Sequence, residues 1–173
     1  MADPKEDLYS QNDEKQFIKE TLHGERAIIG AVIQDNGLMK YAAEHLSPAS
    51  FNIFEHHHIF AAMSELYKRQ AAISKQNIVS ELRLRDALDM AGGEEYVTSL
   101  DLDVPFRLTA EQNDYVDRFI LVAIGKATSA AALNGDFSAK DVINMYFDKT
   151  QRFKELKGWE TNPLLEEDKG FTN

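Results

Sequence analysis

The chain has 173 residues, 43% of them hydrophobic and 28% charged, as expected for one ordinary domain with flexible ends. It has no cysteine and no run of about 20 apolar residues, which excludes disulfides, thiolate metal sites and a membrane span and leads us to expect a cytoplasmic protein. The net charge of −10 argues against direct nucleic-acid binding, because that affinity depends largely on Lys and Arg neutralising phosphates.

The N-terminal part predicts a polar arm and then a long helix. Residues 1–12 are polar, and we expect them to be disordered. From Asp13 to the turn Asn36-Gly37, apolar residues recur at three- and four-residue spacings, which indicates a helix. Gly30 inside it would let another backbone come close. A short helix is expected over 38–46, and Ser47-Pro48, an N-cap followed by proline, starts the next.

Residues 49–69 are the most clearly amphipathic segment, with one broad apolar arc on a helical wheel. Its histidines, His56, His57 and His58, could suggest a metal site, but adjacent side chains on a helix diverge by about 100°. We expect only His58 to point into the arc, so a histidine-dependent metalloprotein is a distant alternative. The residues expected to be buried in the core are Phe51, Phe54, Ile59, Ala62, Met63 and Leu66.

Caps and turns mark the remaining helices, and together the elements predict an all-α fold. The expected parts are a compact helical head over 13–102, a helical hairpin over 103–156 and a polar tail or linker over 157–173. The signals, in chain order, are the N-cap Ser74, the turn Gly92-Gly93, the break at Pro105, the capping box Thr109 with Gln112, the turn Asn134-Gly135 and the N-cap Ser138 with Asp141.

The sequence offers no constellation for catalysis. It contains no phosphate-binding loop, no dinucleotide fingerprint and no nucleophile elbow, and we expect no catalytic residue, cofactor or metal. The acidic pairs Glu94-Glu95 and Glu166-Glu167 are better explained as solvated surface, because adjacent carboxylates diverge on a helix.

The hairpin helices suggest self-association instead of chemistry. Their apolar residues exceed what two helices alone can bury, so we expect copies of the chain to pair there. Trp159, just past the last helix, could fold back onto the bundle or serve as an anchor for a partner. The residues expected to mediate self-association are Phe119, Ile120, Ile124, Tyr146 and Phe147.

Several stretches between Glu25 and about Thr128 resemble, in order and spacing, the N-terminal domain of DnaB-type replicative helicases. His57 stands where the family has an arginine, so the chain resembles a divergent member, plausible for a phage or another mobile element. The matching stretches are Glu25 to Ile33, Leu46 to Phe51, His56 to Tyr67, Gly92 to Leu100, Val104-Pro105 and Tyr115.

The resemblance implies a scaffold. In this family a helical head is followed by a hairpin, the hairpins pair, and six copies form a trimer-of-dimers collar above the ATPase ring. The expected function is therefore a non-catalytic oligomerisation scaffold, a dimer or trimer of dimers, that docks primase or a helicase loader in DNA replication. Helicase or ATPase activity would belong to a C-terminal domain that this chain lacks. The alternative is a stand-alone phage or mobile-element protein that binds and regulates a host replicative helicase or primase.

Overall fold

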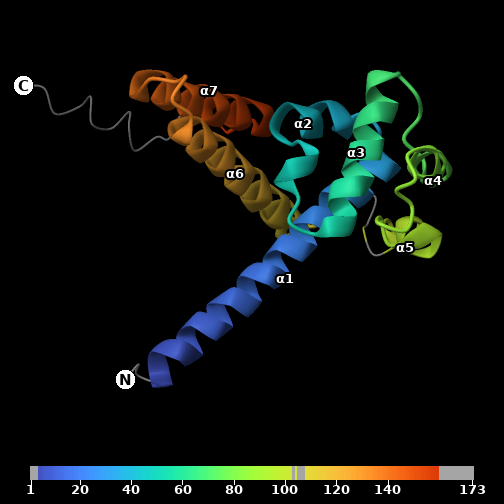
Figure 1. The fold of residues 1–173 in the computed structure, drawn as a ribbon, viewed down its shortest axis with the longest axis horizontal. Helices are drawn as coiled ribbons and strands as arrows, with labels where there is room; N and C mark the ends of the chain where they lie inside the picture. The colour runs from blue at the N-terminus through green and yellow to red at the C-terminus, as the bar shows by residue number, and fades with distance from the viewer. Residues whose placement is uncertain (1–3, 103, 105–107, 160–173) are drawn as a thin grey trace, which may run out of the picture. The chain divides into compact units, whose positions relative to one another are not determined.

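The computed structural model describes residues 4–102, 104 and 108–159, and all regular structure in these ranges is helical (Figure 1). This confirms the predicted all-α class. The chain divides into two compact units, Met1–Ala123 and Ile124–Asn173. The elements are α1 (Pro4–Gln34), α2 (Leu38–His45), the 3-10 helix η1 (Pro48–Ser50), α3 (Phe54–Lys68), α4 (Lys75–Leu84), α5 (Gly93–Ser99), α6 (Ala110–Leu133) and α7 (Ala139–Lys157).

Helix α3 is central to the first unit. It packs against α1, η1 and α4, while α4 also contacts α5 and α1 contacts α2. Large apolar side chains fill the space between these helices, and the aromatic ring of Phe51 contacts those of Phe60 and Phe119, with centroids 4.6 and 5.1 Å away. The core members exposed by less than 2% include Ile29, Ile59, Phe60, Met63, Ile78, Leu82, Leu100 and Ile120.

Two glycines let helix α1 approach other backbone segments. A Cβ at Gly24 would lie 2.8 Å from the carbonyl oxygen of Tyr115 in α6. A Cβ at Gly30 would lie 2.9 Å from the carbonyl oxygen of Leu100 and 2.6 Å from Cγ2 of Val104. The close approach predicted at Gly30 is therefore confirmed, since any larger residue would force these atoms to move.

The expected disordered arm is wrong for residues 4–12, which form the first part of α1. The physical reason lies in the sequence between Pro4 and Gly24, which contains neither glycine nor a second proline and so offers no helix breaker. Pro4 itself is compatible with a first helical position, where its missing N–H has no intrahelical acceptor. Residues 1–3 lie outside the described ranges.

Phe54 is also misplaced by the sequence interpretation, because its side chain is 62% exposed and not buried. Residues 51–53 are not helical, so α3 begins only at Phe54. Nine residues at 100° each place Phe54 on the side of α3 opposite the fully buried Met63. The other five members of the predicted stripe, Phe51 among them, are buried as expected.

The predicted caps at Ser74, Thr109 and Ser138 are confirmed, whereas Ser47 begins the 3-10 helix η1 and not the long helix expected after it, which starts only at Phe54. The Ser74 hydroxyl accepts from the backbone N–H of Asn77. Thr109 and Gln112 exchange hydrogen bonds between side chain and backbone at the start of α6, and Ser138 and Asp141 do the same at the start of α7. Gly92 takes a left-handed conformation (φ 86°) immediately before α5. Each of these signals locates a helix start to within a residue or two.

The second unit contains the C-terminal part of α6, a turn over residues 134–138, and α7. Gly158, with φ 64°, ends α7 in the left-handed conformation that favours glycine. The predicted boundary between head and hairpin at residue 102 is thus moved to Ala123, because the first half of α6 contributes Phe119 and Ile120 to the core of the first unit. Of the predicted tail, residues 160–173 lie outside the described ranges.

Candidate functional site

Helix α7 carries an apolar face that is open to solvent. Ile143, Tyr146 and Phe147 are 55%, 46% and 63% exposed, and we call them the α7 apolar face. Spacings of three and four residues bring such side chains together on one side of a helix. Large apolar side chains grouped in this way are typical of a surface that another molecule covers.

The sequence prediction for self-association is only partly compatible with this geometry. Tyr146 and Phe147 are exposed as predicted. Phe119, Ile120 and Ile124 are only 5%, 0% and 2% exposed, so the expectation that they form surplus surface was wrong. The reason is that the apolar stripe of α6 is already buried within the chain, as the contact between Phe119 and Phe51 shows. Ile143 was missed, although its spacing from Phe147 was visible in the sequence.

Trp159 folds back onto the end of α7, which is one of the two roles considered for it; its role as an anchor for a partner stays a prediction. Its ring meets Phe153 edge to face, with centroids 5.4 Å apart, and Nζ of Lys157 lies 5.8 Å from its centre. Its backbone N–H donates to the carbonyl of Lys154, which fixes it to the end of α7. The side chain is nevertheless 49% exposed, so half of it remains available for contact with a partner.

A buried polar relay joins α1, α3 and α5 in the first unit. Glu25 and His56 are both fully buried, and Oε2 of Glu25 lies 2.8 Å from Nδ1 of His56. Nε2 of His56 lies 2.8 Å from the hydroxyl of Tyr96. The Glu25 carboxylate also accepts from the backbone N–H groups of Asn52 and Ile53, at 2.6 and 3.2 Å. Glu25 therefore supplies the cap that the N-terminus of α3 lacks, since Ile53 has no capping side chain.

The positions of the protons in this relay can be derived from the hydrogen-bond donors and acceptors. A carboxylate that accepts two backbone N–H groups is an acceptor, so Nδ1 of His56 donates to it, and in neutral His56 this leaves Nε2 to accept from the Tyr96 hydroxyl. Burial raises the pKa of Tyr96, and the nearby Arg26 opposes this effect only in part. Both nitrogens of His56 are thus occupied in holding three helices together.

The three adjacent histidines therefore point in different directions around α3 and differ in burial. His56 is completely buried, whereas His57 and His58 are only partly exposed. The prediction that only His58 would face the core was wrong, because it rested on the misplaced Phe54. Within the described ranges, no three His, Cys, Asp or Glu residues are grouped so that they could hold a metal ion.

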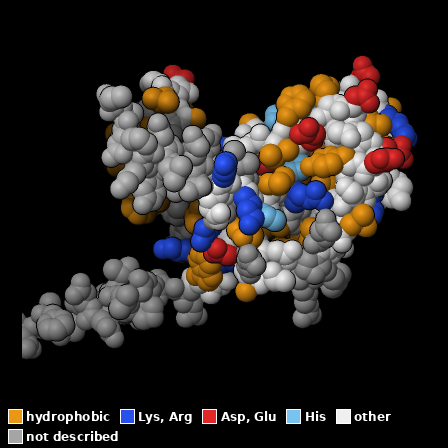
Figure 2. Space-filling model, turned by 90° about the horizontal axis from the view of Figure 1, so that it is seen from below, with side chains coloured by type: hydrophobic (Ala, Val, Ile, Leu, Met, Phe, Trp, Pro, Cys, Tyr) orange, Lys and Arg blue, Asp and Glu red, His pale blue; other side chains and the backbone are white. Residues whose placement is uncertain are grey.

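Charge is unevenly distributed over the surface. Asp and Glu side chains gather at the end where α4 and α5 lie (Figure 2), where Asp86, Asp89, Glu94 and Glu95 are exposed. Glu94 forms an ion pair with Arg83, which neutralises part of this charge. In the ranges that the structure describes, no helix is long and apolar enough to cross a bilayer.

Comparison with known proteins identifies related sequences. The family model for the DnaB-like helicase N-terminal domain matches residues 18–118. The replicative DNA helicase DnaB of Treponema pallidum is 32% identical over 130 residues, which cover 70% of this chain and 29% of that protein. DnaB of Geobacillus stearothermophilus is 27% identical over 138 residues, 77% of this chain and 30% of that protein. The chain thus spans less than a third of these relatives.

Solved structures share the fold. The N-terminal domain of DnaB helicase from Mycobacterium tuberculosis matches 75% of this chain and 96% of that domain, with a TM-score of 0.50 and 22% identity. A DnaB-like replicative helicase, whose structure was described together with its interactions with primase, matches 87% of this chain and 35% of that chain, with a TM-score of 0.52 and 19% identity. At these identities the matches concern the all-helical fold.

Proposed function

The chain belongs to the family of DnaB-like helicase N-terminal domains, and from this premise we propose that it acts in DNA replication as a non-catalytic oligomerisation scaffold and docking site. In this role the first unit receives a partner protein and the second unit joins copies of the chain. The relay of Glu25, His56 and Tyr96 then has a structural task, because both ring nitrogens of the histidine are engaged inside the protein.

The observation that carries the proposal is the α7 apolar face. Ile143, Tyr146 and Phe147 each leave about half or more of their surface in water. Removing apolar surface from water contributes roughly 25 cal/mol per Å². A second copy that presents the same face would bury both surfaces, as in a two-fold symmetric interface. Self-association through α7 therefore removes an apolar surface that the single chain leaves exposed.

The docking part of the proposal is supported by one of the solved relatives. The DnaB-like helicase that shares this fold was described with its interactions with primase. Primase, or a helicase loader that recognises the same head, is accordingly the partner class we propose. The net charge of −10 favours a protein over a nucleic acid as that partner.

Sedimentation velocity tests the proposal. The wild-type chain should sediment as a dimer or larger species at micromolar concentration, whereas Phe147→Glu should sediment as a folded monomer, because a charge in the interface would have to be desolvated. Leu102→Glu is the matched control, since Leu102 is 73% exposed in the first unit and should tolerate the charge without change of mass. A wild-type chain that stays monomeric at high concentration would overturn the scaffold role.

A further inference from the structure

The turn between α6 and α7 contains an Asn-Gly pair that is open to solvent. Asn134 and Gly135 are both exposed, and a Cβ at Gly135 would have no neighbour within 4 Å. The turn is closed by the N–H of Phe137, which donates to the backbone carbonyl of Asn134 at 3.2 Å. Glycine hinders its own peptide nitrogen least, because it has no side chain. The nitrogen of Gly135 is therefore accessible to the side chain that precedes it.

One hydrogen bond orients the Asn134 amide towards this nitrogen. The backbone N–H of Asp136 donates to Oδ1 of Asn134 at 3.1 Å, which folds the side chain back over the Gly135 peptide. Negative charge that develops on Oδ1 during attack at Cγ would be stabilised by the same N–H. Within the described ranges, neither Nδ2 of Asn134 nor the N–H of Gly135 has a hydrogen-bond partner. Attack by the Gly135 nitrogen would therefore break no hydrogen bond at either of these groups.

The second Asn-Gly pair of the chain, Asn36-Gly37, is held differently. Nδ2 of Asn36 donates to the carbonyl oxygens of Val32 and Ile73, at 3.0 and 2.8 Å. Oδ1 of Asn36 accepts from the N–H of Ile73 at 2.8 Å, and the N–H of Gly37 donates to Oδ1 of Asp35 at 3.0 Å. The Asn36 amide cannot turn towards the Gly37 nitrogen without losing its own three hydrogen bonds.

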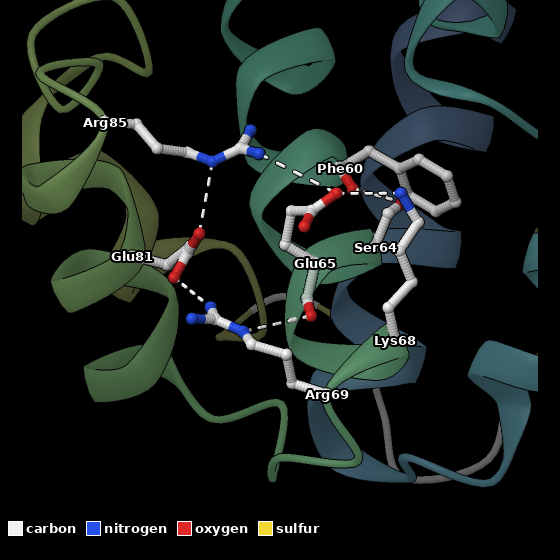
Figure 3. Close-up of polar contacts among 7 residues, drawn as sticks. All are labelled: Phe60, Ser64, Glu65, Lys68, Arg69, Glu81 and Arg85. Carbon is white, nitrogen blue, oxygen red and sulfur yellow. Dashed lines mark hydrogen bonds and ion pairs between the residues drawn. The ribbon is translucent and has the colours of Figure 1, made fainter.

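Ile73, which holds the Asn36 amide, is itself fixed in the first unit. It is 2% exposed and lies in the connection between α3 and α4. Ion pairs join these two helices, because Arg69, just after α3, and Arg85, just after α4, both contact the Glu81 carboxylate (Figure 3). The Asn36 amide is thus tied to a packed part of the chain, whereas the Asn134 amide is bonded only within its own turn.

We propose that Asn134 is a site of spontaneous deamidation and that the fold protects Asn36 from the same reaction. The Gly135 nitrogen loses its proton to hydroxide and forms a bond to Cγ of Asn134, while the bond from Cγ to Nδ2 breaks. Nδ2 takes a proton from water and leaves as ammonia, and a cyclic succinimide remains. Water then opens this ring at either carbonyl group, which gives aspartate or isoaspartate at residue 134.

The reaction changes the charge and the backbone of the turn. The neutral Asn134 becomes an anion close to Asp136, in a turn whose Leu133 and Phe137 side chains are 89% and 48% exposed. In isoaspartate the main chain runs through the former side chain, which adds a methylene group to the turn. The protein therefore occurs in forms that differ in charge and in backbone length between α6 and α7.

Peptide mapping by mass spectrometry tests the assignment. The full chain is incubated at mildly alkaline pH and digested, so that Asn36 and Asn134 are followed in the same sample. In the folded chain, Asn36 should lose ammonia roughly tenfold or more slowly than Asn134. In concentrated urea the two rates should become similar, because unfolding removes the hydrogen bonds to Ile73. Equal rates in the folded chain, or no reaction at Asn134, would overturn the proposal.

A variant tests the role of the Gly135 nitrogen. Gly135 has no positive φ and open space around it, so Gly135→Ala should fold normally. The added Cβ should slow deamidation at Asn134 roughly tenfold, because it restricts the backbone and hinders the nitrogen. Gly125→Ala, which also places a Cβ in open space, is the matched control and should leave the rate unchanged. A rate that Gly135→Ala does not alter would contradict attack by this nitrogen.

Discussion

Oε2 of Glu25 lies 2.8 Å from Nδ1 of His56, although the two residues are 31 positions apart and neither side chain is exposed. Glu25→Ala would leave His56 and the backbone N–H groups of Asn52 and Ile53 without their acceptor. Breaking a buried pair of this kind costs about 3–5 kcal/mol. We therefore expect Glu25→Ala to lower the free energy of unfolding by about this amount, measured by urea denaturation.

Asp114→Ala is the control for this measurement. Asp114 pairs with Arg118 at 2.9 Å, but its side chain is 60% exposed. Exposed pairs contribute about 1 kcal/mol or less, so the variant should remain close to the wild type. Similar losses from Glu25→Ala and Asp114→Ala would show that the relay contributes no more than a surface ion pair.

The two phenylalanines of α3 should respond very differently to truncation. Phe60 is 1% exposed, so Phe60→Ala should cost about 3–5 kcal/mol through lost contacts and a cavity. Phe54 is 62% exposed, so Phe54→Ala should change stability by no more than about 0.5 kcal/mol. Thermal unfolding followed by circular dichroism measures both. A large loss for Phe54→Ala would mean that this residue is covered in solution.

The helical glycines Gly30 and Gly125 form a second matched pair. A Cβ at Gly30 would meet the Leu100 carbonyl at 2.9 Å, and Gly30→Ala should therefore destabilise the fold by about 1–3 kcal/mol. A Cβ at Gly125 has no neighbour within 4 Å, and Gly125→Ala should stabilise it by about 0.5–1 kcal/mol. Urea midpoints test the opposite signs. The same sign for both substitutions would contradict the close approach at Gly30.

The cap of α7 makes a prediction about pH. The Ser138 hydroxyl and backbone N–H donate to Asp141, and these bonds lower the pKa of its carboxyl group. A pKa lowered by folding stabilises the fold above the ordinary carboxyl range, and this contribution disappears as the pH falls through the folded pKa. Ser138→Ala should raise the pKa of Asp141 towards its ordinary value in an NMR titration. Thr150→Ala, whose hydroxyl bonds elsewhere on α7, should leave it unchanged.

Local signals in the sequence located most helix boundaries. The capping boxes at Thr109 and Ser138 and the left-handed Gly92 each depend on residues within four positions, so their consequences are visible in the sequence. Phe54 was misplaced because the break over residues 51–53 carries no proline or glycine. Because of that break, residues 51–53 do not continue the helical wheel of α3. The same error in the wheel led to the wrong prediction that only His58 faces the core.

Tertiary relationships could not be predicted in the same way. The relay connects residues that are 31 and 40 positions apart, and nothing in the local pattern pairs Glu25 with His56 or His56 with Tyr96. The same limit explains why the α6 residues Phe119 and Ile120 were wrongly expected to form exposed surface. The apolar stripe of Phe119 and Ile120 was visible, but the sequence did not reveal that it is buried within the first unit, with Phe119 against Phe51. Which apolar residues remain exposed for contact with a partner therefore depends on packing between distant parts of the sequence.

The most direct test of self-association through α7 is a distance measurement between copies. Because the chain has no cysteine, Asp148→Cys places a single nitroxide label beside the α7 apolar face. Pulsed electron paramagnetic resonance should then show dipolar coupling between copies. The coupling should persist in the control Leu102→Glu and vanish in Phe147→Glu. The absence of coupling in the wild-type background, or coupling that survives Phe147→Glu, would contradict the proposed interface.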